Sequence, residues 1–407
     1  MNSTPVSERM HIAIFGRRNA GKSSLINALT GQELAVVSDV PGTTTDPVYK
    51  TMELLPVGPV VIIDTAGMDD EGELGSLRVE KTNDVLRKTN FAIVVVSALE
   101  GITDFELDFI RKVKEKGIPV VCAVNKLDLK SLDQGDMEEI RSRVGIPVIG
   151  VSSLLKTGIE ELKKAISDNA VYEDRDLSIC GDLISPGDFV VLVTPIDKAA
   201  PKGRLILPQQ QTIRDIIEKD AMAVITKEYE LKETIENLGK RPSLVITDSQ
   251  AFLKVSADVP EDIPLTSFSI LFARYKGELM EMVRGLKRIE SLKSGSRVLV
   301  VEGCTHHRQA DDIGKVKIPR WVRQLSGGEI EFEWASGNFF PKDIKKYDLI
   351  IHCGGCMLNN KEMQYRINFS KENNVAITNY GMLIAYVQGI LKRALAPFPA
   401  TLMLLEE

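Results

Sequence analysis

The chain has 407 residues, and at about 150 residues per domain this length predicts two or three domains. Hydrophobic residues make up 43% and charged residues 27%, a composition that excludes a mostly disordered chain. The net charge is −6, and the sequence has neither an apolar run of ~18 residues nor a signal-peptide core. We therefore expect a cytoplasmic protein with no nucleic-acid or membrane partner.

The first 170 residues alternate short apolar runs with segments of helical period. We predict buried strands at 11–15, 60–63, 92–96, 120–124 and 148–151, and helices that include 76–89 and 104–116. The strands are apolar almost throughout, as a parallel sheet covered on both faces requires. This alternation is typical of a doubly wound α/β domain.

Two polar stretches, at 172–178 and 259–264, divide the rest of the chain. Between them we predict a small α/β unit, with strands at 189–193, 221–225 and 244–247 and helices at 211–218 and 227–238. The last part is predicted to begin with one amphipathic helix over 268–291, followed by strands at 297–301, 330–334, 349–352 and 375–378. The whole chain is therefore expected to be α/β.

Residues 16–23 read Gly-Arg-Arg-Asn-Ala-Gly-Lys-Ser and match the phosphate-loop pattern G-x-x-x-x-G-K-[ST] between a predicted strand and helix. In this context, backbone N–H groups of the loop and of the helix N-terminus surround the phosphates. Lys22 would reach the β- and γ-phosphates, and Ser23 would offer its hydroxyl to Mg²⁺. The expected nucleotide contacts here are Gly16, Asn19, Ala20, Gly21, Lys22, Ser23 and Ser24.

Two further segments indicate Mg²⁺-dependent phosphoryl transfer. Asp64 ends a predicted strand and begins the sequence Asp-Thr-Ala-Gly, in which Asp64 would hold Mg²⁺ through water and the N–H of Gly67 would meet the γ-phosphate. Thr44, the middle of three threonines, is the candidate switch residue that coordinates Mg²⁺. The candidate catalytic residues are therefore Lys22, Thr44, Asp64 and Gly67.

The base is predicted to be guanine. Asn125, Lys126 and Asp128 follow a buried strand, and a carboxylate there can accept both N1–H and the 2-amino group of guanine, which adenine does not offer in that arrangement. Ser152 and Ser153 follow the next strand, where a backbone N–H could bind the guanine O6. GTP or GDP is the expected ligand.

Over residues 10–168 these motifs together resemble translation-factor-like GTPases, particularly the TrmE–Era branch. The resemblance implies that Asn19 matches an asparagine through which that branch uses K⁺ as a catalytic cation. Met68 stands where small signalling GTPases carry the glutamine that orients water, and a thioether cannot do so. We therefore expect slow, K⁺-stimulated hydrolysis of GTP to GDP and phosphate, assisted by another group such as an acid among residues 69–73.

Three of the five Cys and three of the four His lie between residues 304 and 356. Cys304 and His306 follow one predicted strand, and His352, Cys353 and Cys356 follow another. Side chains at the ends of neighbouring strands can converge outside the sheet edge. The Cys-x-x-Cys spacing places two thiolates within reach of one metal, and the two glycines between them leave N–H groups free to bond sulfur.

Three kinds of site fit this pattern. Zinc would take four of these Cys and His residues, a redox dithiol would need only Cys353 and Cys356, and an iron–sulfur cluster would take three thiolates. His306 and His352 are expected either to bind the metal or to hydrogen-bond its ligands. Cys122 and Cys180 are expected to be inert core residues.

The GTPase motifs, the small middle unit and the C-x-H…H-C-x-x-C pattern together resemble HydF, the family of [FeFe]-hydrogenase maturation GTPases. The resemblance implies a GTPase domain at 1–171, a dimerisation domain at 172–265 and a cluster-binding domain at 266–407, and hence a homodimer or higher oligomer. It implies a [4Fe–4S] cluster held by Cys304, Cys353 and Cys356.

The HydF resemblance also implies a scaffold and carrier role. A transient diiron precursor would be built with radical-SAM maturases and passed to apo-[FeFe]-hydrogenase. The alternative is a zinc-containing GTPase of ribosome or tRNA maturation, which is the usual activity of the TrmE–Era branch.

Overall fold

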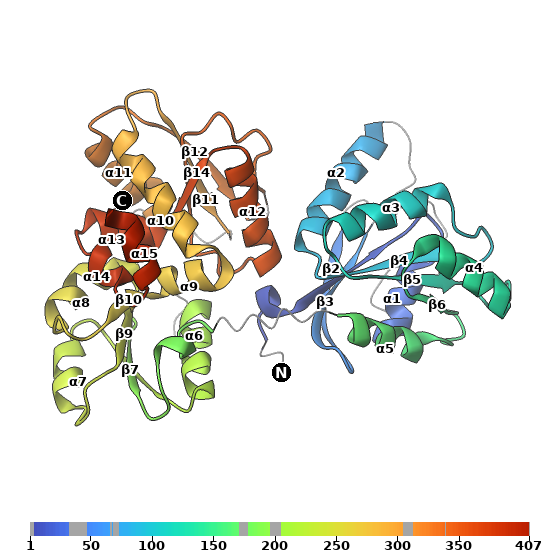
Figure 1. Cartoon of the computed structure of the whole chain (residues 1–407), viewed down its shortest axis with the longest axis horizontal. Coiled ribbons are helices and arrows are strands. Elements are labelled where there is room, and N and C mark those ends of the chain that lie inside the picture. Colours follow the sequence, from blue (N-terminus) through green and yellow to red (C-terminus); the bar gives the residue numbers. More distant parts are fainter. Residues whose placement is uncertain are drawn as a thin grey trace. The chain divides into compact units, whose positions relative to one another are not determined.

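A computed structural model describes most of the chain, namely residues 4–31, 47–65, 67, 73–170, 178–195, 205–303, 312–337 and 339–406. The chain divides into two compact units, Met1–Glu173 and Asp174–Glu407. Each unit is an α/β structure in its own right (Figure 1). Among the described residues, no helix combines the length and the apolar character needed to cross a membrane.

Unit one contains a six-stranded sheet in the order β2-β3-β1-β4-β5-β6, in which only β2 runs antiparallel to its neighbour. Its strands are β1 (Met10–Phe15), β2 (Val48–Leu54), β3 (Gly58–Asp64), β4 (Phe91–Ser97), β5 (Val120–Asn125) and β6 (Val148–Gly150). Its helices are α1 (Lys22–Thr30), α2 (Glu73–Lys88), α3 (Asp104–Glu115), α4 (Gln134–Val144) and α5 (Ile159–Asn169). The five predicted strands are present.

The sheet of unit one is covered on both faces, as a doubly wound fold requires. Leu25 of α1 and Leu162 of α5 are buried in one core, while Leu86 of α2 and Ile110 of α3 are buried in the other. All five residues of β1 from His11 to Phe15 are buried. The predicted doubly wound α/β domain is therefore confirmed, and it carries the phosphate loop at the carboxyl end of β1.

Unit two contains two four-stranded parallel sheets, ordered β10-β9-β7-β8 and β12-β11-β13-β14. The first is formed by β7 (Phe189–Val193), β8 (Met222–Thr226), β9 (Leu244–Thr247) and β10 (Leu265–Ser267), with α6 (Leu207–Glu218), α7 (Leu231–Asn237) and α8 (Phe252–Asp258). The second is formed by β11 (Arg297–Glu302), β12 (Glu331–Ser336), β13 (Leu349–His352) and β14 (Ala376–Asn379).

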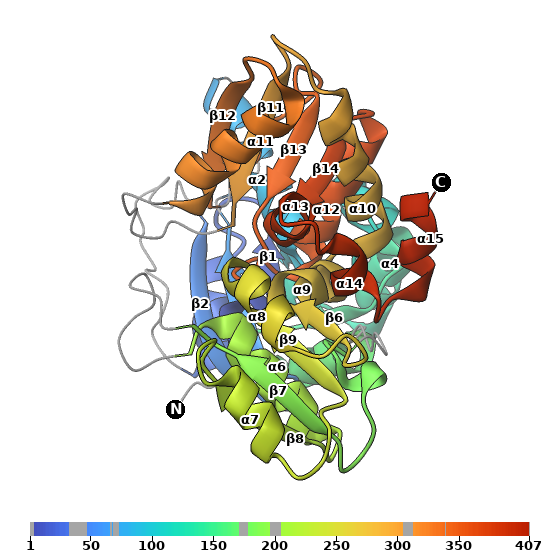
Figure 2. The same cartoon turned by 90° about the vertical axis from the view of Figure 1, so that its left-hand side faces the viewer.

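The remaining helices of unit two are α9 (Phe268–Lys276), α10 (Leu279–Lys287), α11 (Ile318–Ser326), α12 (Asn360–Glu372), α13 (Tyr380–Val387), α14 (Leu391–Leu395) and α15 (Pro399–Glu406). One continuous hydrophobic core includes residues of both sheets, such as Val191 of β7 and Val300 of β11. Figure 2 shows the two sheets one above the other with α9 at their junction. The middle and C-terminal segments are thus packed as one body.

The single helix expected over 268–291 is wrong, because the chain breaks between α9 and α10. A Cβ atom on Gly277 would lie 2.7 Å from the carbonyl oxygen of Ala273, so the backbone there is too crowded for another residue type. The side-chain amide of Gln364, on α12, donates to the carbonyls of Lys276 and Gly277 at 3.2 and 3.0 Å. A partner distant in sequence therefore satisfies carbonyls at the break.

Candidate functional site

The phosphate loop lies between β1 and α1 and needs glycine at two positions. Gly16 has a φ of 152°, and a Cβ there would lie 2.4 Å from the carbonyl oxygen of Val95. Gly21 has a φ of 92°, and a Cβ there would lie 2.2 Å from Nδ2 of Asn125. The loop therefore packs closely against β4 on one side and the end of β5 on the other, and neither position has room for a side chain.

Lys22 is at the start of α1, and its side chain folds back so that the ammonium lies against the phosphate loop. Nζ donates to the carbonyl oxygens of Gly16 and Arg17 at 3.0 and 2.8 Å, and the residue is only 8% exposed. A buried cation held by two loop carbonyls places positive charge where the phosphates of a nucleotide would lie. Ser24 follows in the first turn of α1 and is half-buried.

Ser23 and Asp64 approach each other from α1 and β3. The Ser23 hydroxyl donates to Oδ2 of Asp64 at 2.9 Å, while Oδ1 of Asp64 is buried with no hydrogen-bond partner among the described residues. Burial raises the pKa of Asp64, and the Ser23 hydrogen bond and the Lys22 charge both oppose that rise. An oxygen left without a partner beside a hydroxyl is a donor set that suits Mg²⁺.

Asn125 joins the base-binding segments to the phosphate loop. Its Nδ2 donates to the carbonyl of Ala20 at 3.1 Å, and its Oδ1 accepts from the backbone N–H and the hydroxyl of Ser153 at 3.0 and 2.9 Å. The Ser152 hydroxyl donates to Oδ1 of Asp128 at 2.5 Å. Ser152 therefore orients the carboxylate expected to read guanine, a role that the sequence pattern did not suggest.

Three other expected nucleotide contacts are placed by their backbone. Asn19 and Lys126 both adopt the left-handed region, with φ of 57° and 69°. Gly67 is described and half-buried. Thr44 and Met68 lie outside the described residues.

Arg17 is a phosphate-loop residue that the sequence analysis missed. Its Nε bonds Oε1 of Glu106 at 2.5 Å, and its Nη2 lies 3.2 Å from Oε2 of Glu100. Glu106 is 1% exposed and also caps α3 by accepting from the N–H of Thr103 at 3.0 Å. The Thr-x-x-Glu capping pattern was the available signal, but it does not show that Glu106 holds the phosphate loop to α3.

Residues 353–358, which we call the cysteine segment, begin where β11 and β13 end side by side, with Val301 opposite His352. The Cys353 sulfur accepts from the N–H of Gly303 at 3.0 Å and from the N–H of Gly355 at 3.4 Å. Gly355 has a φ of 64°, which turns the chain back toward that sulfur. Two backbone donors directed at one sulfur are the surroundings expected of a thiolate or a metal-bound thiolate.

Only part of the expected ligand set can be placed. Cys304 and His306 lie outside the described residues, although Cys304 follows Gly303 directly in the sequence. Cys356 is half-buried, and burial raises the pKa of its thiol while the Lys276 charge opposes that rise. Within the described ranges, no group of three or more His, Cys, Asp or Glu side chains is arranged to hold a metal ion.

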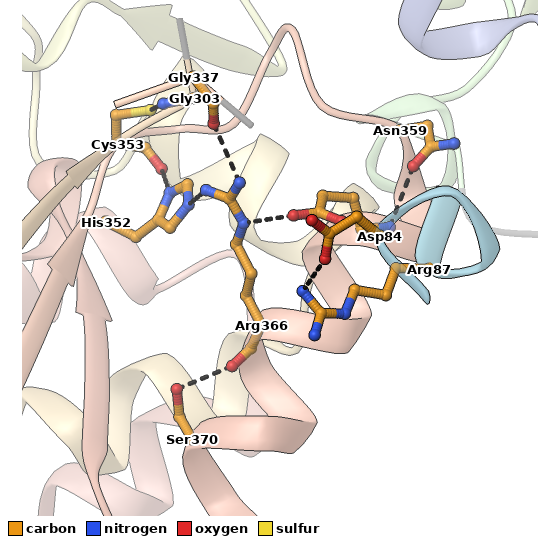
Figure 3. A network of polar contacts seen from close by, with 10 residues as sticks. Asp84, Arg87, Gly303, Gly337, His352, Cys353, Asn359, Arg366 and Ser370 are labelled. Atoms are coloured by element: carbon orange, nitrogen blue, oxygen red, sulfur yellow. Dashed lines mark hydrogen bonds and ion pairs between the residues drawn. The ribbon is translucent and has the colours of Figure 1, made fainter. Parts of the chain in front are cut away.

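His352 is fully buried behind the cysteine segment, where Figure 3 shows it between Cys353 and Arg366. Its Nε2 lies 3.0 Å from Nη1 of Arg366, and its Nδ1 lies 2.7 Å from the carbonyl oxygen of Cys353. Because a guanidinium only donates, Nε2 must accept, and Nδ1 therefore carries the proton that it donates to Cys353. Burial, reinforced by the Arg366 charge, lowers the pKa of His352 to about 3.

Arg366 of α12 is itself held on two other sides. Its Nε bonds Oε1 of Glu362 at 2.8 Å, and its Nη2 donates to the carbonyl of Gly337 at 3.0 Å. Both Arg366 and Glu362 are buried, with exposures of 0% and 3%. The pair therefore forms a fixed support for the His352 ring, and both ring nitrogens are used by contacts within the chain.

The other two described cysteines lie in hydrophobic cores. Cys122 is fully buried in β5, and burial raises the pKa of its thiol to about 12. Cys180 is fully buried beside Asp215, and burial likewise raises the pKa of its thiol. Both are therefore protonated and unreactive at neutral pH.

Three family models match consecutive parts of the chain. Residues 11–126 match a model described as a 50S ribosome-binding GTPase. Residues 179–277 match the hydrogen maturase F dimerization domain, and residues 280–397 match the hydrogen maturase F tetramerization domain.

Curated relatives match the GTPase part. The tRNA modification GTPase MnmE of Geobacillus kaustophilus (strain HTA426) is 36% identical over 163 residues, which are 40% of this chain and 34% of that protein. The protein of the same name from Aquifex aeolicus (strain VF5) is 36% identical over 162 residues, again 40% and 34%. The chain thus spans about a third of the length of these relatives.

Two of the solved structures that the chain matches are the following. The G domain of the T. maritima FeoB iron transporter is 27% identical, covering 40% of this chain and 99% of that chain, with a TM-score of 0.31. An Aquifex aeolicus Era bound to GDP and aluminium fluoride is 18% identical, covering 57% and 99%, with a TM-score of 0.37. Both TM-scores are too low to indicate a shared function.

Proposed function

This chain belongs to the hydrogen maturase F (HydF) family, and on that premise we propose that it is a GTP-hydrolysing scaffold for [FeFe]-hydrogenase maturation, which binds a [4Fe–4S] cluster and transfers a diiron subcluster precursor to apo-hydrogenase. The observation that carries the cluster proposal is the position of the Cys353 sulfur. It lies where β11 and β13 end, with the N–H groups of Gly303 and Gly355 directed at it.

We assign the cluster to Cys304, Cys353 and Cys356. The residues present fit such a group, because thiolates are its usual ligands and backbone N–H donors to sulfur stabilise it. Three thiolates leave one iron open to an exchangeable ligand, which is the chemistry that a carrier of iron cargo needs. His352 is assigned as a support for the Cys353 carbonyl rather than as an iron ligand, since both of its ring nitrogens have partners in the chain. His306 remains a candidate for the open position.

The GTPase domain is proposed to act as a switch. Ser23 and Asp64 would hold Mg²⁺ together with Thr44, and Asn19 would hold the stimulating K⁺. Lys22 and the N–H of Gly67 would stabilise charge on the γ-phosphate. Because Met68 cannot orient water, we expect slow turnover, in which hydrolysis regulates partner release rather than the iron chemistry.

The remaining assignments concern partners. The dimerization and tetramerization models support an oligomer. Residues 172–265 are proposed to form the dimerisation domain and residues 266–407 the cluster domain, following the GTPase domain at 1–171. Radical-SAM maturases would supply the diiron precursor, and apo-[FeFe]-hydrogenase would receive it.

Anaerobic reconstitution with iron and sulfide tests the cluster assignment. The purified full chain should give the visible and EPR spectra of a [4Fe–4S] cluster. Cys304→Ala, Cys353→Ala and Cys356→Ala should each lose these spectra while GTP hydrolysis stays nearly unchanged. Cys180→Ala is the matched control, because that thiol is buried elsewhere in the same unit, and it should keep the cluster.

The alternative hypothesis for the same cysteines is a zinc site in a GTPase of tRNA or ribosome maturation. It predicts a colourless protein that retains stoichiometric zinc after the same reconstitution, and that result would overturn the cluster assignment. Joint loss of the cluster and of GTP hydrolysis in the cysteine variants would contradict the separation of the two sites.

A further inference from the structure

Lys276, the last residue of α9, is a buried lysine next to the cysteine segment. It is 1% exposed, and its Nζ donates to the carbonyl oxygens of Cys356 and Leu358 at 2.9 and 3.0 Å. A buried ammonium is costly unless hydrogen bonds compensate for the lost water. Both of these hydrogen bonds end on the segment that carries the second cysteine of the Cys-x-x-Cys pair.

The two carbonyls bracket the turn that follows Cys356. The N–H of Leu358 donates to the carbonyl of Gly355 at 3.0 Å, which closes this turn, and Lys276 fixes it from the side of α9. Lys276 is in turn positioned by the helix break, where Gln364 binds its carbonyl at 3.2 Å. The lysine therefore links the end of the segment matched by the dimerization model to the cysteine segment.

The charge of Lys276 also matters at this position. The Lys276 ammonium contacts the backbone of Cys356 itself, which places its charge beside that residue. In a medium of low dielectric constant, positive charge so near a thiolate stabilises the negative form.

We propose that Lys276 is a positioning residue of the cluster site, which fixes the turn after Cys356 and raises the reduction potential of the cluster bound there. Reduction adds negative charge to a cluster, so a buried cation beside one of its ligands favours the reduced state. This inference rests on the proposed function, because it requires that Cys356 hold a cluster.

The test compares reconstituted full-length proteins by EPR-monitored redox titration and by the rate of iron loss to a chelator. Lys276→Met should shift the midpoint potential to a more negative value and increase iron loss by about 10- to 100-fold, as for other residues that support metal ligands. Lys276→Arg, which keeps the charge and donors, should restore most of the potential. Lys276→Gln, which keeps hydrogen-bond donors without the charge, should give a midpoint potential more negative than that of the unmodified protein, as Lys276→Met does.

Lys371→Met is the matched control, since it removes the same charge from an exposed lysine of the same unit that pairs with Glu278. It should behave as the unmodified protein. If Lys276→Met or Lys276→Gln keeps the potential of the unmodified protein, or if Lys276→Arg shifts it as far as Lys276→Gln, the inference is overturned. If the unmodified protein takes up no cluster, the proposed function itself fails, and that result is distinguishable from the first two.

Discussion

At the scale of single residues, each candidate site contains buried polar atoms, some of which have partners within the chain and one of which does not. Asp64 has one oxygen bonded to Ser23 and the other buried without a partner among the described residues. Because the Arg366 guanidinium can only donate, Nε2 of His352 accepts and the proton of the neutral ring is on Nδ1. In each case the chemistry follows from which atom is already occupied, and the sequence motif alone does not contain that information.

Asp64→Asn should weaken Mg²⁺ binding, because an amide replaces the carboxylate that we propose as the Mg²⁺ site. We expect a loss of about 10- to 100-fold in Mg²⁺ affinity, measured from the Mg²⁺ dependence of GTP hydrolysis. Asp168→Asn, on the exposed side of α5, removes the same charge and should have no effect. An unchanged Mg²⁺ dependence in Asp64→Asn would exclude this residue from the metal site.

His11 should make unit one less stable in mild acid. Burial lowers the pKa of His11 to about 4, whereas an unfolded histidine has a pKa near 6.5. Between these values the unfolded chain binds a proton that the folded chain does not, so the free energy of unfolding falls by about 1.4 kcal/mol for each pH unit of acidification. Below about pH 4 the folded His11 is protonated too, and the effect saturates.

Denaturant titrations of unit one from pH 7 to pH 4 measure this dependence. His11→Asn removes the titrating ring and should flatten the pH dependence by about one proton, whatever its effect on stability at pH 7. A slope that is the same in both proteins would show that His11 does not titrate as its buried position requires.

The residue scale also shows where sequence reasoning stopped. The placement of the phosphate loop, Asp64, Asn125 and Asp128 at or just after the ends of strands was predictable, because these strands have a continuous apolar pattern. The ion pair of Arg17 with Glu106 was not predictable, since the two residues are separated by 89 positions and meet only when α3 packs on β4 and β5. The support of the cysteine segment by Lys276, across 80 positions, was missed for the same reason.

At the scale of elements, helices approach sheets closely where glycine allows it. Gly285 of α10 packs on β14 so tightly that an added Cβ would lie 1.9 Å from the carbonyl oxygen of Ile377. Such a contact cannot be relieved by a side-chain rotation, because the neighbouring atom is backbone. The close packing of α10 on β14 is therefore possible only because residue 285 is glycine.

Gly285→Ala should lower the free energy of unfolding of unit two by about 3 kcal/mol, the upper part of the usual range for overpacking. Gly135→Ala, in α4 of unit one, is the control, because its Cβ would meet only one side-chain oxygen, Oδ1 of Asp133 at 3.2 Å, and no backbone atom. That change should be neutral or slightly stabilising, as alanine is the better helix former. Equal effects of the two substitutions in denaturant titrations would refute the argument.

Elements were predictable where burial imposes a continuous apolar pattern, as in β4, in which all seven residues are buried. Strand β2 was missed because its residues from Val48 to Glu53 are exposed or half-buried and give no such pattern. The break between α9 and α10 was missed because Gln364 stabilises it from another helix. Local pattern thus identifies most of the longer strands, whereas short or edge strands such as β10 and β2 and the interruption after α9 depend on tertiary contacts.

At the scale of the whole molecule, the chain is built from two units that contain different candidate sites. Unit one contains the described part of the nucleotide site, and unit two contains Cys353 and Cys356. The two sheets of unit two share one hydrophobic core, so they are expected to unfold together. The proposed boundary near residue 265 therefore lies within one packed unit.

Calorimetry of the full chain should accordingly show two transitions, one for each unit. GTP or GDP with Mg²⁺ should raise only the transition temperature of unit one. At 100 times its Kd, the ligand raises the free energy of unfolding of that unit by about 2.7 kcal/mol. The Gly285→Ala change should lower only the other transition. A third separate transition would contradict the common core of unit two.

Activation of apo-[FeFe]-hydrogenase by the purified, fully loaded protein tests the central claim most directly. We expect hydrogen evolution to appear when the loaded protein is added to the inactive enzyme. The Cys353→Ala variant, taken through the same loading procedure, should fail to activate it, although it still hydrolyses GTP. Absence of activation by the unmodified loaded protein, or equal activation by the Cys353→Ala variant, would contradict the account.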